Sequence, residues 1–376
     1  MKYRKWYDKK IETSLLGFGA MRFKTDKNGD IDKEKADALI KKAYEAGVNY
    51  FDTAMPYTDG KNETFVGESL KRFPRDSFYL ATKLSLGYLK TKEEVLNAID
   101  LQLKSLQTDY IDFYLLHALN KDKIDIIKEW KILDIVKQWQ EEGKIRYIGF
   151  SFHDDYKTFK QILDMYSWDF CQIQLNYMDT EIQQGIRGYF DCEEKKIPIV
   201  VMEPIKGGKL SNFNEEVSKI FTDYNKGASL SSWALRYVGS LGGVKTILSG
   251  MNEMEQVEDN LKTFSNFVPL NPEEHTLVMK VKKALKNIIE VDCTKCGYCM
   301  PCPHGVDIPG NFSIFNDYAM YKNEGSAKWV FSNLVKNNAD FNQCIYCQEC
   351  LPKCPQMINI PEELKRMQEE LKFLNE

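Results

Sequence analysis

Apolar and polar positions follow a regular rhythm over residues 13–266. Short runs that are apolar on both faces, such as Ile197–Met202, are separated by stretches with helical periodicity. Runs of this kind are typical of parallel strands that are covered by helices. The pattern predicts eight strands, at Ser14–Ala20, Val48–Thr53, Phe78–Leu84, Tyr110–His117, Ile145–Phe152, Phe170–Asn176, Ile197–Ile205 and Lys245–Gly250. Eight such units in about 250 residues favour a (β/α)8 barrel.

The segments between these runs show helical periodicity and predict helices. Examples are Lys33–Ala46, Lys92–Ser105 and Ile126–Glu142. The opening segment Tyr3–Thr13 alternates charged and apolar residues, and we expect a small hairpin there that plugs the barrel floor. A doubly wound open sheet is the rival fold, but it usually has fewer strands and a glycine-rich turn after the first strand. Residues 17–22 lack the third glycine of that turn.

The pattern changes after residue 270. Asn271 and Pro272 read as the cap and first position of a helix, and Glu274 can reach back to the cap amide. We therefore expect the barrel over residues 1–270, a linker helix over 271–290, and a small, mainly helical ferredoxin-like domain over 291–376.

Charge and composition exclude several classes of protein. The 376 residues carry 51 Lys and Arg against 55 Asp and Glu, a net charge of −4, so we expect no nucleic-acid partner. No apolar run approaches the ~18 residues of a membrane span. The basic start of the chain is not followed by the apolar core of a signal peptide. These features predict a soluble, cytoplasmic protein with no membrane association.

The distribution of the ten cysteines is more informative than their number. Cys171 and Cys192 stand apart and are expected to be buried thiols, whereas the other eight crowd into residues 293–354. In a reducing compartment, clustered thiols are metal ligands more often than disulfides.

The eight clustered cysteines form two runs with iron–sulfur spacing. The second run is Cys344-x2-Cys347-x2-Cys350-x3-Cys354-Pro355, the bacterial ferredoxin spacing for a [4Fe–4S] cluster, whose fourth cysteine ligates the other cluster in two-cluster proteins. The first run is one residue shorter before its last cysteine. With crossed ligation, one cluster takes Cys293, Cys296, Cys299 and Cys354, and the other takes Cys344, Cys347, Cys350 and Cys302.

Two other interpretations of these runs stay open. The clusters could serve only to staple a domain that is too small to build its own core. Alternatively, the first run could hold zinc, with His304 nearby as a spare ligand.

A second set of chemically capable residues lies at the predicted strand ends. Asp52 ends the second strand, Lys83 the third and His117 the fourth, and Tyr57 follows in the loop after Asp52. In α/β barrels the C-terminal strand ends share one rim, so these side chains should converge. A lysine beside a tyrosine lowers the pKa of its hydroxyl, and an aspartate can hold that lysine. Such a phenol can protonate a carbonyl oxygen while hydride reaches the carbon.

These motifs resemble those of the aldo-keto reductase family. The matching residues are Asp52-Thr53-Ala54-x2-Tyr57, Gly60-x-Asn62-Glu63-x3-Gly67, Thr82-Lys83 and Leu116-His117. The whole chain is similar to the subgroup with a C-terminal [4Fe–4S] ferredoxin-like domain. The resemblance implies that Tyr57 is the general acid, that Lys83 and Asp52 tune its pKa, and that His117 orients a carbonyl substrate.

The resemblance also implies a nicotinamide cofactor, NAD(P)H. It places Ser151 and Gln174 near the nicotinamide, and Asp259 and Asn260 near the adenine. After the seventh strand, Gly207-Gly208-Lys209 is compatible with either a pyrophosphate contact or a plain turn. At the positions where the family holds the 2′-phosphate of NADP, this sequence has Gly250 and Gln256. Residues 249–260 contain four acids and no base, so a 2′-phosphate would lack a bidentate partner and NADH is favoured.

Three functional interpretations follow. The first is a nicotinamide-dependent oxidoreductase that reduces a small aldehyde or ketone, with two [4Fe–4S] clusters for electron transfer. In the second, ferredoxin or another one-electron carrier feeds the clusters, and these supply the barrel site. The third is a non-enzymatic redox sensor or electron-transfer subunit, against which the intact tetrad argues.

Overall fold

The computed structural model describes residues 1–7, 10–293, 295, 297–354 and 356–375. Its backbone divides into two compact units. Residues 1–207 and 231–272 form the first unit, and residues 208–230 and 273–376 form the second. Residues 208–230, which the sequence pattern assigns to the barrel, therefore group with the C-terminal unit, as do residues 273–290.

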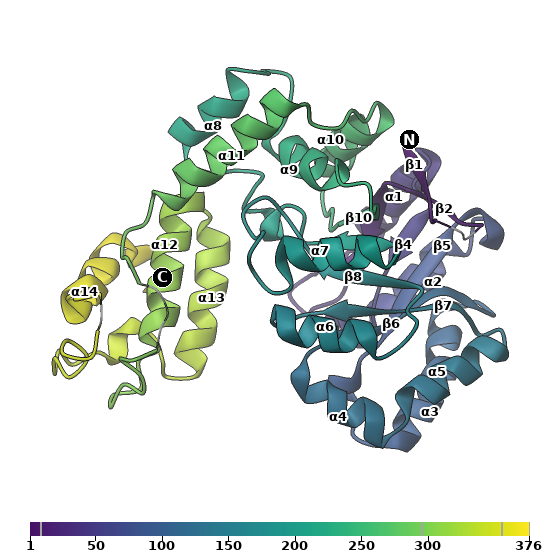
Figure 1. Ribbon diagram of the computed structural model, residues 1–376, viewed down its shortest axis with the longest axis horizontal. Helices are drawn as coiled ribbons and strands as arrows, with labels where there is room; N and C mark the ends of the chain where they lie inside the picture. The colour runs from purple at the N-terminus through teal and green to yellow at the C-terminus, as the bar shows by residue number, and fades with distance from the viewer. Residues whose placement is uncertain (8–9, 294, 296, 355, 376) are drawn as a thin grey trace. The chain divides into compact units, whose positions relative to one another are not determined.

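The first unit is built around a closed barrel of eight parallel strands (Figure 1). The strands are β3 (Leu16–Gly19), β4 (Tyr50–Asp52), β5 (Tyr79–Leu84), β6 (Ile111–Leu119), β7 (Ile145–Phe152), β8 (Phe170–Gln174), β9 (Ile199–Met202) and β10 (Val244–Ser249). They follow one another around the barrel in chain order, and β10 closes it by pairing with both β9 and β3. The predicted (β/α)8 barrel and its eight strands are confirmed.

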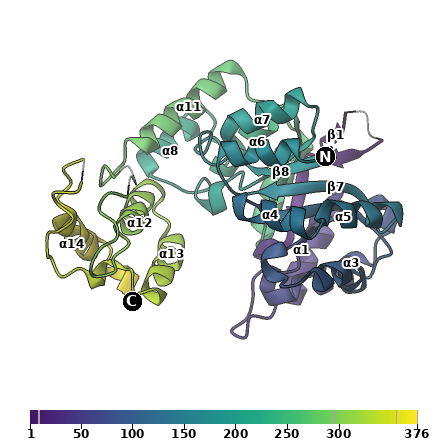
Figure 2. The same ribbon diagram turned by 60° about the horizontal axis from the view of Figure 1, so that its bottom comes forward.

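Helices cover the outside of this barrel, as the helical periodicity predicts. Figure 2 shows α4 to α7 along the outside of β7 and β8. The helices of this unit are α1 (Lys33–Glu45), α2 (Asn62–Leu70), α3 (Lys92–Leu106), α4 (Lys121–Glu129), α5 (Ile132–Glu141), α6 (Tyr156–Asp164), α7 (Gly185–Glu194), α9 (Leu230–Gly239) and α10 (Met254–Ser265). Side-chain caps begin several of them, for example Thr91, which accepts a hydrogen bond from the Glu94 amide at 3.2 Å.

One helix prediction is wrong. The single helix expected over Ile126–Glu142 is two helices, α4 and α5, because Lys131 adopts a left-handed conformation with φ of 56°. This break lacks the glycine or proline that usually marks such a point.

The predicted N-terminal hairpin is present. Strands β1 (Tyr3–Lys5) and β2 (Glu12–Ser14) pair antiparallel. The Trp6 side chain that follows β1 is fully buried, with its ring 4.6 Å from Phe113 and 5.8 Å from Phe170. Trp6 and Ile11 thus extend the core among inward-facing strand residues.

The second unit is helical. Its helices are α8 (Glu215–Thr222), α11 (Pro272–Lys286), α12 (Ile308–Tyr321), α13 (Glu324–Lys336) and α14 (Ile360–Glu370). Buried side chains of α12, α13 and α14 form one apolar core that includes Phe312, Phe315, Phe331 and Leu364. Several cysteines pack against this core. Within the described residues, no helix is long and apolar enough to cross a bilayer.

Candidate active site and cluster-binding sites

The barrel carries a cavity of about 560 Å³ that opens to solvent at the C-terminal ends of its strands. Its lining includes Asp52, Tyr57 and His117 of the predicted tetrad, together with Ser151 and Gly250. The fourth member, Lys83, lies directly against this lining. The structure therefore brings the four sequence-predicted residues together.

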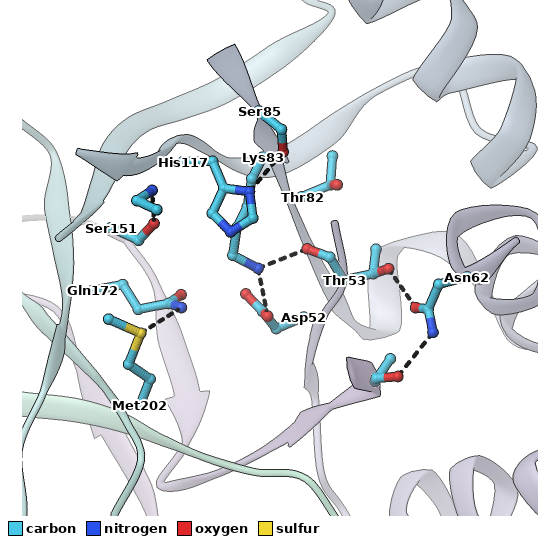
Figure 3. A network of polar contacts seen from close by, with 12 residues as sticks. Asp52, Thr53, Asn62, Thr82, Lys83, Ser85, His117, Ser151, Gln172 and Met202 are labelled. Atoms are coloured by element: carbon cyan, nitrogen blue, oxygen red, sulfur yellow. Dashed lines mark hydrogen bonds and ion pairs between the residues drawn. The ribbon is translucent and has the colours of Figure 1, made fainter. Parts of the chain in front are cut away.

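Lys83 is the centre of the polar network in Figure 3. Its Nζ donates to Asp52 Oδ1 at 2.6 Å and to the Thr53 carbonyl at 2.7 Å (Figure 3). Both ionic side chains are almost completely buried. Burial opposes the charge on Lys83, but Asp52 and Tyr57 outweigh this effect and raise its pKa. Lys83 therefore stays an ammonium group beside the reacting side chains.

Tyr57 lies between Lys83 and His117. Lys83 Nζ is 5.0 Å from the Tyr57 ring centre, and the His117 ring meets the Tyr57 ring edge-on at 6.0 Å. The expectation of a lowered Tyr57 pKa is wrong: burial raises that pKa more than Lys83 lowers it. The phenol consequently keeps its proton at neutral pH, as a proton donor must.

His117 is held as a neutral imidazole. Burial, and then the charge of Lys83, lower its pKa to about 2. Its Nδ1 lies 2.6 Å from Ser85 Oγ (Figure 3). Sequence reasoning missed Ser85, which follows the last residue of β5 and lies two residues beyond Lys83.

Buried polar side chains next to Lys83 hydrogen-bond to one another and to its backbone. Glu63 Oε1 accepts hydrogen bonds from Thr82 Oγ1 at 2.5 Å and from Gln102 Nε2 at 2.7 Å. Gln102 also donates to the Lys83 carbonyl at 3.1 Å. Gly67 permits the close approach of α2 to α3, because a Cβ there would lie 2.6 Å from the Leu106 backbone. The sequence motif that contains Glu63 and Gly67 therefore helps to position Lys83, through hydrogen bonds and through close packing of α2 against α3.

Of the two glutamines on β8, the structure places Gln172 and not the predicted Gln174 at the cavity wall. Gln174 does not line the cavity; its Nε2 donates to Asp179 at 3.0 Å and its Oε1 accepts from Gln183 at 3.0 Å. Gln172, two residues earlier on the same face of β8, lines the cavity instead. Its buried Oε1 has no hydrogen-bond partner among the described residues. The alternation of β8 identifies the face, but not which of its two glutamines reaches the cavity.

The side chains of Ser151 and Gln172 fit a carboxamide such as that of nicotinamide. Ser151 Oγ accepts from the Ala118 amide at 2.7 Å, which leaves its own proton for a ligand oxygen. The unpaired Gln172 Oε1 is an acceptor for a ligand NH2 group.

The residues predicted to contact the pyrophosphate, the 2′-phosphate position and the adenine lie on several separate segments. Gly207 has a φ of 63°, and Gly250 lies against Arg22, whose Cγ would be 2.7 Å from a Cβ at position 250. Gln256 Oε1 accepts from the Asn252 amide at 2.9 Å. Asn260 is buried and donates to Ser249 Oγ at 2.9 Å, one residue beyond Asp259.

Lysines from distant parts of the chain neutralise part of the negative charge at residues 253–259. Glu253 is paired with Lys24, and Glu258 with Lys42 at 3.6 Å. Both lysines come from segments more than 200 residues away, so local sequence reasoning missed them. Two cations near the cavity are also engaged, Lys206 with Asp179 at 2.6 Å and Arg22 with Glu203 at 3.5 Å.

The two cysteine runs surround two separate cavities in the second unit. The first is lined by Cys302, Cys344, Cys347 and Cys350, with Cys299 and His304 also at its wall. The other is lined by Cys293, Cys299 and Cys354. Cys296 lies outside the described residues.

The arrangement fits two clusters with crossed fourth ligands. Burial, together with nearby Cys344, Cys347 and Cys302, raises the pKa of Cys350 to about 11, so these four thiols are neighbours. Among the described residues, no three His, Cys, Asp or Glu side chains are grouped as ligands of a single metal ion. The two remaining cysteines, Cys171 and Cys192, are buried as predicted, with their sulfurs 3.4 Å apart.

Comparisons with known protein families match both parts of the chain. Residues 15–283 match the aldo/keto reductase family, and residues 292–359 match the 4Fe-4S dicluster domain. This chain belongs to the aldo/keto reductase family, as an oxidoreductase with a C-terminal 4Fe-4S dicluster domain.

Individual relatives cover the barrel. L-galactose dehydrogenase of Arabidopsis thaliana is 24% identical, covering 74% of this chain and 93% of its own. The NADH-specific methylglyoxal reductase of Escherichia coli is also 24% identical, covering 69% and 91%. In the solved structures, an aldo-keto reductase from Bacillus halodurans in its holo form is 28% identical, covers 75% of this chain and 96% of its own, and superposes with a TM-score of 0.63.

Proposed function

We propose that the protein reduces a small aldehyde or ketone with a reduced nicotinamide nucleotide at the barrel site. The observation that carries this proposal is the neutral Tyr57 hydroxyl beside the buried Lys83–Asp52 ion pair. A bound reduced nicotinamide supplies the hydride, and the chain's own residues supply the proton and the orientation.

Tyr57 is the general acid in this proposal. Its phenol stays protonated at neutral pH and donates that proton to the carbonyl oxygen. The Lys83 ammonium stabilises the phenolate that forms, because a fixed, buried cation acts strongly on a negative charge that develops beside it. Asp52 keeps Lys83 in position through their 2.6 Å contact.

His117 orients the carbonyl oxygen toward Tyr57. Because its imidazole is neutral, only one of its nitrogens carries a proton. Donation by Ser85 to Nδ1 leaves that proton on Nε2, which then donates to the substrate oxygen. Ser151 and Gln172 bind the carboxamide and thereby set the face of the nicotinamide ring.

NADH is the favoured nucleotide. Neither Gly250 nor Gln256 provides a cation for a 2′-phosphate, and Lys206 is bound to Asp179. The names of the relatives cover both nucleotides, since one is called NADH-specific and the aldo-keto reductase yakc of Schizosaccharomyces pombe carries NADP(+) in its name. The choice therefore rests on the residues of this chain.

The barrel over residues 1–270 is the catalytic module, residues 271–290 link it to the rest, and residues 291–376 hold two [4Fe–4S] clusters for electron transfer. One cluster is held by Cys293, Cys296, Cys299 and Cys354, and the other by Cys344, Cys347, Cys350 and Cys302. The clusters supply one-electron chemistry when bound.

The two complete thiol sets also favour a second candidate. A hydride carries two electrons, whereas each cluster passes one at a time, so clusters have no necessary role in hydride transfer. In the alternative function, ferredoxin or another one-electron carrier reduces the clusters, which then supply the barrel site with Tyr57 as proton donor.

Anaerobic purification followed by nucleotide titration tests the proposal. Submicromolar to micromolar NADH binding with carbonyl-dependent NADH oxidation supports it. The second candidate replaces it if neither nucleotide binds below millimolar while chemically reduced clusters sustain turnover.

A further inference from the structure

Lys123 is a cation of the barrel cavity that neither the tetrad nor the nucleotide contacts use. It lies in the first turn of α4, and its half-buried side chain lines the cavity together with His117 and His153. Its Nζ donates to the Ala118 carbonyl at 2.7 Å and to the His117 carbonyl at 3.1 Å.

The two carbonyls that Lys123 binds belong to an irregular part of β6. Pairing with β7 shifts register between Leu116 and Leu119, and Ala118 has a φ of 50°. Such a bulge turns carbonyls out of the ladder, so they need another donor. The lysine satisfies both with two of its three N–H donors. One donor remains.

The charge of Lys123 distinguishes it from the other cations of the cavity. Lys83 is paired with Asp52, and Arg22 with Glu203. Among the described residues, no carboxylate lies within the 4.0 Å ion-pair distance of Lys123 Nζ. The carbonyls need a hydrogen-bond donor but no full charge, and a partly buried charge without a counterion is costly. The cavity thus has a positive charge and a spare donor that an anion would satisfy.

We propose that Lys123 binds a carboxylate of the substrate, which makes the substrate class oxo acids. This inference rests on the proposed carbonyl reduction. A single N–H donor with a single charge suits a carboxylate better than a phosphate, which carries nearly two charges and favours the fork of an arginine. The carboxylate binds Lys123 while the carbonyl oxygen of the same molecule lies between Tyr57 and His117.

The test compares each oxo acid with its own uncharged amide. The kcat/KM values for 2-oxobutanoate and 4-oxopentanoate are divided by those for the corresponding primary amides, with NADH as the reductant. Wild type should prefer at least one acid. In Lys123→Met the acid-to-amide ratio should fall about 10- to 100-fold, mainly through KM, as expected for the loss of a charged hydrogen bond.

Two further variants separate charge from position. Lys123→Arg keeps the charge and should retain most of the ratio. Lys121→Met removes an exposed charge from the same helical turn and should leave the ratio as in wild type. Equal losses for acid and amide in Lys123→Met would show that the lysine only supports the bulge, and would overturn the inference. A wild-type preference for both amides would also overturn it.

A binding measurement keeps this inference separate from the proposed function. Calorimetry with the non-reducible acids butanoate and pentanoate should detect binding in wild type that Lys123→Met loses. If NADH supports no turnover but this Lys123-dependent binding persists, the carboxylate site stands and the nicotinamide function fails. Acid binding that is equal in wild type and Lys123→Met overturns the carboxylate site.

Discussion

At the residue scale, the Tyr57 hydroxyl is the one proton donor that the proposed reaction requires. Tyr57→Phe removes the proton and keeps the ring that packs edge-on against His117. Turnover should fall by roughly 10²–10⁴-fold, the usual contribution of general acid catalysis. Steady-state kinetics of the cluster-loaded protein measures this effect, and cluster absorbance serves as the control for folding. Unchanged turnover would falsify Tyr57 as the acid.

His117 makes the stability of the barrel depend on pH. Its pKa is about 2 in the folded protein against about 6.5 when unfolded, so below pH 6.5 the unfolded chain binds a proton that the folded chain does not. Stability is therefore lost as the pH falls, by about 1.4 kcal/mol between pH 7.5 and 5.5.

A His117→Gln variant should lack this part of the pH dependence. Tryptophan fluorescence follows the barrel, since five of the six tryptophans lie before residue 270. Between pH 7.5 and 5.5 the wild-type melting temperature should fall about 3–6 °C further than that of the variant. Parallel pH curves for the two proteins would contradict a neutral, buried His117.

Residue-scale chemistry was only partly predictable from sequence. Asp52, Tyr57, Lys83 and His117 were identifiable because strand ends meet at one rim. The direction of the Tyr57 pKa shift was not, because it depends on how far burial outweighs the nearby cation. Alternation puts Gln172 and Gln174 on one face of β8 but does not tell which of the two lines the cavity, because it gives a face and not a depth.

At the element scale, we expect the segment from Ser249 into α10 to determine whether NADH or NADPH binds more tightly. Gln256 offers an amide where a phosphate needs a cation, and loss of a charge-assisted contact costs ~1.5–3 kcal/mol. NADH should therefore bind about one to two decades more tightly than NADPH. Because Lys24 and Lys42 partly neutralise the acidic flank, most of this gap should come from the missing cation.

Replacing Gln256 by arginine should reduce the difference in affinity between NADH and NADPH, because the arginine supplies a cation for the 2′-phosphate. Gly250 is left unchanged, because a side chain there would collide with Arg22. Gln161→Arg, an exposed substitution on α6, adds the same charge elsewhere and serves as the control. Fluorescence titration with both nucleotides measures the affinities. An NADPH preference in the unmodified protein would show that another cation reaches the 2′-phosphate.

The two cysteine runs lead to a separate prediction about the iron content of the protein. Wild type should hold about eight iron and eight sulfide per chain after anaerobic reconstitution. Cys344→Ser with Cys347→Ser should remove one cluster and leave about four iron. In that background, Cys354→Ser should remove the remaining iron, whereas Cys302→Ser should not.

The effects of Cys302→Ser and Cys354→Ser on the remaining iron tell crossed ligation from ligation within each run. If Cys302→Ser removes the remaining iron and Cys354→Ser spares it, each run binds its own cluster. Zinc in place of iron would contradict the iron–sulfur interpretation of the first run.

The elements themselves were largely predictable. The eight strands stand out because they are apolar on both faces, and periodicity locates most helices. The break between α4 and α5 was not predictable, because Lys131 has no intrinsic preference for a left-handed backbone. The bulge that extends β6 past His117 was missed for a similar reason: it depends on partners from β7 and α4, which bind Ala118 from both sides.

At the scale of the whole molecule, two kinds of electron chemistry share one chain. The barrel site is suited to hydride, which moves two electrons together, and the C-terminal unit is suited to clusters, which move one. The sequence comparisons establish both modules. The grouping of residues 208–230 with the C-terminal unit was not predictable, because only tertiary contacts assign that segment.

The origin of the hydrogen on the product carbon tests the central claim most directly. The anaerobic, cluster-loaded protein is given an oxo acid and NADH that is deuterated at the transferable position of the nicotinamide ring. Direct hydride transfer predicts that the deuterium appears on the new C–H bond of the product, and that Tyr57→Phe slows its appearance. A product whose new C–H hydrogen comes from solvent, formed when chemically reduced clusters are the only reductant, would contradict the account.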